Sequence, residues 1–258
     1  MRFFHWLVAA MVLFVVAPAF PQGKKSSEPT KPLETRSSQE LSPYLPAPGD
    51  RQLTAELNRV CRNIQDFQVC AQAVEKAQLP RYPQQVSRQG KILRLTLKTG
   101  KVVEFKDVDI DAGKHYDQVD KIVFYNFREY LRDLGYFLVH VFYFEGNDYL
   151  MVNDQNGERY SLPDLFLLSP DRQRLATVLT SPAFIPTGIQ IWRITPEKMT
   201  KEWSLEPKDW GPKDGAWQDN DTLTFTKTSY DPVQRQKRSE KMMVRRDASG
   251  WKLLPAKP

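Results

Sequence analysis

The second half of the sequence is a series of short apolar segments, each bounded by Pro, Gly, Asp or Asn. The segments cover residues 136–144, 149–154, 158–163, 188–194, 199–205, 214–218, 222–228, 239–246 and 250–254. Many short, turn-bounded strands are typical of β-sandwiches, barrels and propellers. We therefore predict a mainly β domain over residues 90–258, propeller-like or built from stacked antiparallel sheets.

Two of these segments are apolar on both faces. YFLVHVFYF (136–144) is apolar throughout except for His140, and GIQIWRI (188–194) places large apolar side chains on either side. Because side chains alternate between the faces of a strand, both segments are expected to be covered on two sides.

The region before residue 136 mixes both kinds of element. KILRLTL, KTGK and VVEFKDV predict a β-hairpin over residues 91–108. Residues 126–135 have apolar side chains three and four apart, with Asn126 available as an N-cap and Gly135 as a terminator. These features predict a helix packed on the β-rich unit.

The segment SPDRQRLATV (169–178) connects two apolar runs through a sharp turn. It resembles the Ser-Pro-Asp-Gly corner of β-propellers of the TolB and WD40 type, and GIQIWRITPEKMTKEW resembles the strand pair that follows it. Arg172 stands where the family has glycine. The resemblance covers about residues 136–254 and implies about three blades, fewer than the four that a closed ring normally needs. Leu175 and Leu223, 48 residues apart, suggest a blade-length repeat.

The N-terminus has the features of an export signal. Arg2 precedes an apolar run, and Ala17-Pro18-Ala19 fits a cleavage site, so residues 1–19 are predicted to be a signal peptide, with an uncleaved anchor as the alternative. Residues 20–49 are rich in Pro, Ser and charged residues, which predicts a disordered linker. A periplasmic or secreted protein without a membrane span after cleavage is expected.

Residues 50–83 are expected to form a helical hairpin, because Gly is absent and Pro occurs only at its end. Its two cysteines, Cys61 and Cys70, are predicted to form a disulfide in an oxidising compartment, with two reduced thiols as the alternative. Nine residues of continuous helix rise about 13.5 Å, which exceeds the reach of a disulfide. The helix should therefore break near residues 62–66.

The chain carries 37 Lys and Arg against 31 Asp and Glu, a formal charge of +6. So modest an excess in an exported protein argues against a nucleic-acid partner and favours an envelope protein or an anionic glycan. The simpler interpretation, which the small size of the excess favours, is a protein that is basic without such a partner.

Motifs with a defined chemistry are missing from the sequence. DVDIDAG (107–113) has the acidic spacing of a calcium loop, but Ala112 and Gln118 occupy the positions where the loop needs Gly and a carboxylate. His140, in its apolar run, is expected to be a core residue. Nucleophile, phosphate-loop and dinucleotide motifs are absent. We therefore expect no metal and no cofactor.

Candidate binding residues lie in the last quarter of the chain, which holds five of the six tryptophans. Trp210, among turn residues, is expected to be the exposed one, and Arg245 and Arg246 end the basic segment 237–246. Trp residues in short strands also serve as core, and basic residues also protect sheet edges.

Two functions fit these observations. One is a non-enzymatic binding or scaffold module that contacts a protein or an envelope glycan. The other is an envelope hydrolase that uses carboxylates distant in sequence. A cleft with two carboxylates about 5–10 Å apart would indicate the hydrolase. An exposed Trp and Arg patch would indicate binding.

Overall fold

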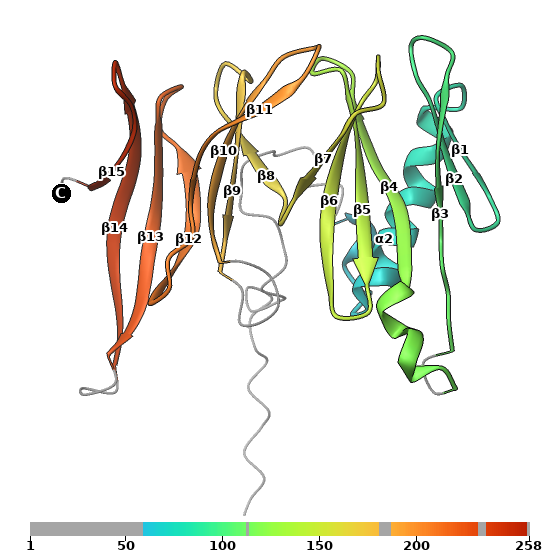
Figure 1. Ribbon diagram of the computed structural model, residues 1–258, viewed down its shortest axis with the longest axis horizontal. Coiled ribbons are helices and arrows are strands. Elements are labelled where there is room, and N and C mark those ends of the chain that lie inside the picture. Colours follow the sequence, from blue (N-terminus) through green and yellow to red (C-terminus); the bar gives the residue numbers. More distant parts are fainter. Residues whose placement is uncertain (1–58, 112–113, 181–186, 232–235, 257–258) are drawn as a thin grey trace, which may run out of the picture. The chain divides into compact units, whose positions relative to one another are not determined.

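A computed structural model describes residues 59–111, 114–180, 187–231 and 236–256. The described chain is mainly β, with four antiparallel sheets and little helix (Figure 1). The predicted signal peptide and linker, and part of DVDIDAG, lie outside the described residues. Over the described residues, no helix combines the length and the apolar character required to cross a bilayer.

The helical region breaks between its two cysteines, as predicted. Helical residues end at Cys61, and α2 (Phe67–Gln78) begins after Asp66, whose carboxylate accepts a hydrogen bond from Val69 N at 2.9 Å. Cys61 and Cys70 form a disulfide, with their Cα atoms 5.3 Å apart. A short 3-10 helix, η1 (Leu79–Arg81), follows α2. Residues 50–58 of the predicted hairpin are outside the described residues.

Sheet A contains the predicted hairpin at residues 91–108 and one further strand before it. Its strands, in spatial order, are β1 (Val86–Gln89), β2 (Ile92–Thr96) and β3 (Val102–Lys106). The 3-10 helix η2 (Tyr116–Lys121) then leads into the second sheet.

The helix predicted for residues 126–135 is wrong, because this segment belongs to a strand of sheet B. The strands of sheet B, in spatial order, are β4 (Val123–Leu131), β5 (Tyr136–Tyr143), β6 (Gly146–Asn153) and β7 (Arg159–Leu162). The helical spacing was misleading because β4 buries side chains on both faces. Gly135, with φ of 79°, closes the turn between β4 and β5 instead of ending a helix.

Sheets C and D each have four strands in consecutive order. Sheet C contains β8 (Phe166–Leu168), β9 (Arg174–Leu179), β10 (Gly188–Ile194) and β11 (Met199–Leu205). Sheet D contains β12 (Trp210–Trp217), β13 (Thr222–Asp231), β14 (Gln236–Asp247) and β15 (Gly250–Pro255). The strands predicted at residues 188–194 and 199–205 match β10 and β11 at both ends.

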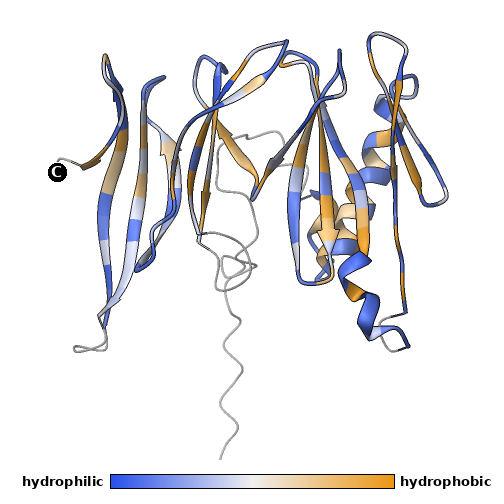
Figure 2. Ribbon diagram, viewed as in Figure 1, coloured by the Kyte–Doolittle hydropathy of each residue, from blue (hydrophilic) through white to orange (hydrophobic). Residues whose placement is uncertain are grey.

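Neighbouring sheets share apolar cores. Along β5, Phe137 and Val139 pack in a cluster with sheet A, whereas Tyr136 and Leu138 pack in a cluster with sheet C. A third cluster joins sheets C and D. In Figure 2, apolar residues lie along the middle of the strands and polar residues gather in the turns. Sheets B and C are therefore covered on two faces, as the segments around residues 136–144 and 188–194 predicted.

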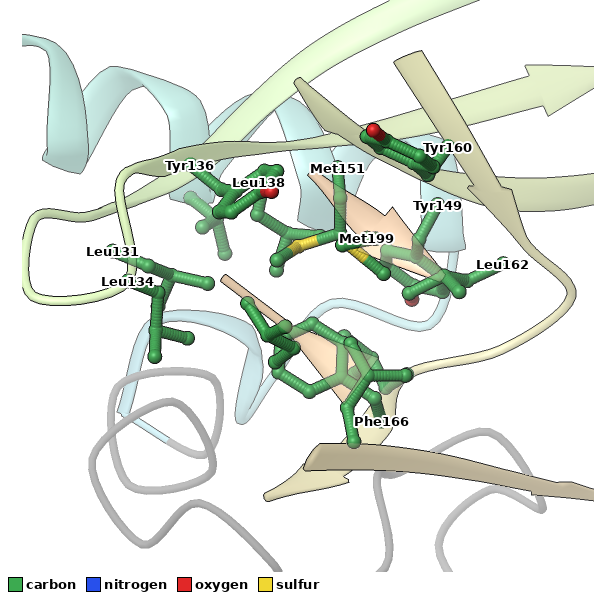
Figure 3. Packing of buried hydrophobic residues seen from close by; sticks show 14 residues of the cluster. Leu131, Leu134, Tyr136, Leu138, Tyr149, Met151, Tyr160, Leu162, Phe166 and Met199 are labelled. Carbon is green, nitrogen blue, oxygen red and sulfur yellow. The ribbon is translucent and has the colours of Figure 1, made fainter. Parts of the chain in front are cut away.

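Figure 3 shows the core between sheets B and C. Leu138 and Met151 of sheet B face Phe166 and Met199 of sheet C, and none of the four is more than 5% exposed. Burying a large apolar side chain contributes about 1.5–3 kcal/mol, so this core is a major source of stability.

The corner at residues 169–172 connects β8 and β9. Ser169 Oγ donates a hydrogen bond to Asp171 at 2.6 Å, and Arg172 has φ of 58° in the left-handed region. Glycine adopts this conformation without strain, which explains why it is common at such corners. Leu175 and Leu223, the pair predicted to be equivalent, are fully buried in the second strands of sheets C and D.

A partly buried arginine joins sheets A and B to α2. Arg88 of β1 donates two hydrogen bonds to Glu75, each at 2.8 Å, and one to Asp107 at 3.0 Å. Glu75 also accepts a hydrogen bond from the backbone N of Phe127 in β4 at 2.6 Å. Asp107, the first acid of DVDIDAG, therefore serves this ion-pair network.

Candidate binding surface and buried polar cluster

The predicted binding residues lie at two different ends of sheet D. Trp210 is the cross-strand neighbour of Ser229, whereas Arg245 neighbours Thr222. Seven residues of β13 separate these positions, which corresponds to about 23 Å along a strand. Trp210 and the two arginines therefore do not form one patch.

Trp210 is partly buried, which corrects the prediction that it is exposed. Its ring is parallel to that of Phe225, with centroids 6.0 Å apart, and Lys227 Nζ lies 5.7 Å from its centroid. The residue begins a strand and packs against the core between sheets C and D. A Trp210→Ala change would remove this packing together with any binding contact.

The two arginines have different surroundings. Arg246 pairs with Asp221 at 2.8 Å, and its guanidinium lies 6.0 Å from the ring centroid of Trp251. Arg245 is exposed. Arg246 thus stabilises sheet D, and only Arg245 offers a largely accessible charge.

A surface cleft of about 470 Å³ lies on the hairpin formed by β13 and β14. Its lining residues are Lys227, Ser229, Arg238, Ser239 and Glu240. Trp210 lies beside the cleft, since it neighbours Ser229 across the strands and Lys227 through its ring. The structure therefore places one predicted binding residue next to a polar cleft that includes part of the basic segment 237–246.

The cleft has one carboxylate, and that carboxylate is paired. Glu240 lies 3.4 Å from Lys227 Nζ. The two-carboxylate arrangement expected of a glycoside hydrolase is therefore not found at this cleft. Two cations against one anion favour a negatively charged or polar ligand.

The hairpin half that carries the cleft is open on one edge. Residues Gln236–Glu240 of β14 are exposed, and the pairing between β14 and β15 begins only at Met242. The residues of β14 before Met242 are polar or charged, as Figure 2 shows. Charged edge strands discourage sheet-to-sheet pairing, which fits the polar character of this edge.

A second polar group, which we call the Arg128 cluster, lies between sheets B and C. It consists of Asn126, Arg128, His140, Tyr149, Asp164 and Thr177. Asn126 and His140 are cross-strand neighbours, and the His140 ring stacks on Tyr149 with centroids 4.2 Å apart. The Arg128 guanidinium lies 5.6 Å from the centroid of the same tyrosine.

A β-bulge explains how Arg128 comes to lie in the interior. The register between β4 and β5 shifts between Phe127 and Glu129, so Arg128 has no cross-strand partner. Bulges of this kind redirect a side chain. From the opposite sheet, Thr177 faces the cluster because it alternates along β9 with Ala176, which packs toward sheet D.

Burial strongly perturbs the titration of this cluster. It lowers the pKa of His140 to about 3, with the nearby Arg128 charge acting in the same direction. It raises the pKa of Asp164 to about 6, although Leu165 N donates to this carboxylate and Arg128 is nearby. At neutral pH the His140 ring is therefore uncharged. Shifted pKa values of this kind gather at functional sites but also occur in structural networks.

Sequence reasoning placed His140 correctly in the core but missed the rest of the cluster. The segment that contains Arg128 was predicted to be a helix, and its neighbours Asp164 and Thr177 are 36 and 49 residues further along the chain. In a strand that is apolar on both faces, an arginine such as Arg128 indicates a buried polar site. This signal was missed because the strand itself was predicted to be a helix. The core alternative holds for the tryptophans of the last quarter, since each is partly buried and packs against a core cluster.

The chain matches no protein-family model and no curated protein sequence.

Proposed function

We propose that this protein is an exported, non-enzymatic binding or scaffold module of the cell envelope, periplasmic or secreted. The disulfide between Cys61 and Cys70 supports export, because disulfides persist in oxidising compartments. The N-terminal sequence, with its positive start, apolar run and small residues, supports the same conclusion.

We also propose a propeller-like arrangement for sheets B, C and D. Each is a four-stranded antiparallel sheet in consecutive order, as in a propeller blade. Their first strands begin at Val123, Phe166 and Trp210, 43 and 44 residues apart, which is close to the length of a WD40 repeat. With sheet A the described chain has four sheets, and the proposal does not require them to close into a ring.

The cleft on the β13–β14 hairpin carries the functional proposal. It presents Lys227, Arg238 and two serine hydroxyls beside a tryptophan, a combination suited to the sulfates, carboxylates and hydroxyls of an anionic glycan. An acidic segment of an envelope protein has the same charge. We take the glycan as the primary ligand, since Ser229 and Ser239 add hydrogen-bonding capacity for sugar hydroxyls.

Affinity chromatography of residues 20–258 on dextran sulfate and on neutral dextran tests the proposal. We expect retention on the sulfated polymer only, and elution by salt. The double variant Lys227→Glu with Arg238→Glu should weaken binding by about tenfold or more, since two close charges reverse.

A matched control is available on sheet A. Lys91→Glu with Arg94→Glu causes the same change in net charge at two cations that pair with Asp109 and Glu104 at the surface. We expect this variant to bind nearly as well as the wild type. Equal loss in both double variants would mean that only net charge matters, and the cleft would be ruled out as the binding site.

A further inference from the structure

The Arg128 cluster holds five polar atoms that have no hydrogen-bond partner among the described residues. They are Asn126 Oδ1, Arg128 Nε, Arg128 Nη2, His140 Nδ1 and Thr177 Oγ1. Buried polar groups in folded proteins are nearly always paired, and an unpaired buried charge is the most costly exception. Several such atoms in one region indicate a partner that is not part of the described chain.

The unpaired atoms of Arg128 define what that partner must offer. Nε and Nη2 lie on one edge of the guanidinium and donate in parallel, which matches the two oxygens of a carboxylate. Within the described residues, no carboxylate accepts a hydrogen bond from Nε or Nη2 of Arg128, and the guanidinium lies over the face of Tyr149. A single bidentate anion would satisfy this edge.

The neighbouring unpaired atoms require hydrogen-bond donors. His140 Nε2 lies 3.0 Å from Asn147 Oδ1, and because that oxygen only accepts, Nε2 carries the proton. The neutral ring then has an acceptor at Nδ1. Asn126 Oδ1, from the cross-strand neighbour of His140, is a second acceptor. A ligand that met these atoms as well as Arg128 would carry a hydroxyl or ammonium group in addition to its carboxylate.

We propose that the Arg128 cluster binds a small hydroxy acid or amino acid, with the carboxylate on Nε and Nη2 of Arg128. The hydroxyl or ammonium group then donates to His140 Nδ1 or Asn126 Oδ1. Access is from the side of Asn147, Asp164 and Gln190, which are partly exposed. The unpaired atoms themselves are buried, so binding requires the side chains around them to move. This site is independent of the proposed glycan cleft.

Isothermal titration with lactate, glycine, acetate and glycerol tests the ligand class. We expect lactate or glycine to bind, acetate to bind more weakly and glycerol not to bind. Arg128→Met should weaken binding by about two orders of magnitude, which is typical for loss of one partner of a buried charge pair. Its unliganded melting temperature should not fall below that of the wild type, because the variant removes an unpaired charge.

A second variant separates recognition of the donor from recognition of the carboxylate. His140→Phe keeps a ring to stack on Tyr149 but removes the Nδ1 acceptor. It should reduce the preference for lactate over acetate, because of the two acceptors only Asn126 Oδ1 is then left for the hydroxyl. The double variant of the hairpin cleft should bind lactate as the wild type does. Absence of binding by both lactate and glycine, unchanged affinity in Arg128→Met, or equal binding of chloride would each overturn the proposal.

Discussion

Two interfaces between neighbouring sheets each bury one arginine, but across the residues that the structure describes only one of the two arginines is paired with a carboxylate. Between sheets C and D, Arg174 is 3% exposed and donates from Nε to Glu202 at 2.8 Å. Between sheets B and C, Arg128 is 4% exposed, and its Nε and Nη2 donate to nothing in the described chain. Equal burial therefore does not imply equal pairing.

Arg174 and its partner Glu202 have further contacts that Arg128 lacks. Trp251 Nε1 also donates to Glu202, at 3.1 Å, and the Arg174 guanidinium lies 5.8 Å from the Trp251 ring centroid. Burial by itself raises the pKa of Glu202, but hydrogen bonds from Arg174 and Trp251 outweigh it and lower the pKa. Within the described residues, the buried arginine between sheets C and D is thus paired with a carboxylate, whereas the one between sheets B and C is not, and an unpaired buried charge lowers stability.

The largest effect should come from breaking the paired arginine. Arg174→Met leaves the Glu202 carboxylate without its main partner. We therefore expect the free energy of unfolding to fall by about 3–5 kcal/mol. Urea denaturation of residues 20–258 measures this loss.

The matched control is an arginine paired at the surface. Arg94 bonds Glu104 at 2.7 Å, with side chains 33% and 53% exposed, so Arg94→Met should cost less than about 1 kcal/mol. If Arg174→Met and Arg128→Met lowered stability by the same amount, the contrast between the two interfaces would be refuted.

A second, smaller effect concerns the acid stability of the interface between sheets B and C. Burial lowers the pKa of His140 from 6.5 to about 3. The unfolded chain binds this proton below about pH 6.5 while the folded chain does not, so stability present above pH 6.5 is lost as the pH falls. At pH 4.5 the loss from this residue is about 2–3 kcal/mol.

His140→Phe isolates that contribution. The ring can still stack on Tyr149, but nothing titrates at this position. Urea denaturation at a series of pH values should show a smaller loss of stability between pH 6.5 and 4.5 than in the wild type. Parallel pH profiles for the two proteins would show that His140 takes up its proton in the folded state at its ordinary pKa.

The contrast between the two arginines also shows what the sequence could predict. GIQIWRI and MTKEWSL match β10 and β11 because Pro, Gly and Thr bound them and their large side chains alternate. The cysteine pair was predictable because only Cys61 and Cys70 are present, and the helix between them had to break. Features set by neighbours in sequence were therefore accessible.

Features set by the packing of sheets were not. Residues 126–135 satisfy a helical spacing only because β4 buries apolar side chains on both faces. The bulge that turns Arg128 inward arises from pairing with β5, and the absence of an acid beside it depends on sheet C. The hairpin cleft likewise arises because β14 continues beyond the edge that β15 covers, which no local pattern indicates.

The smallest effect should come from Asp164, the acid of the Arg128 cluster. Burial raises its pKa from 3.8 to about 6, so the folded chain holds a proton that the unfolded chain has lost between these values. Stability from this residue is complete below pH 3.8 and declines as the pH rises through 6, opposite in sign to the His140 effect. Asp164→Asn keeps an oxygen for Leu165 N and removes the titration. Because Asp164 is partly exposed, we expect the variant to be more stable than the wild type at pH 7 by only about 1–2 kcal/mol. If Asp164→Asn were instead less stable at pH 7, the carboxylate would be acting as the partner of Arg128, and the interface between sheets B and C would be paired after all.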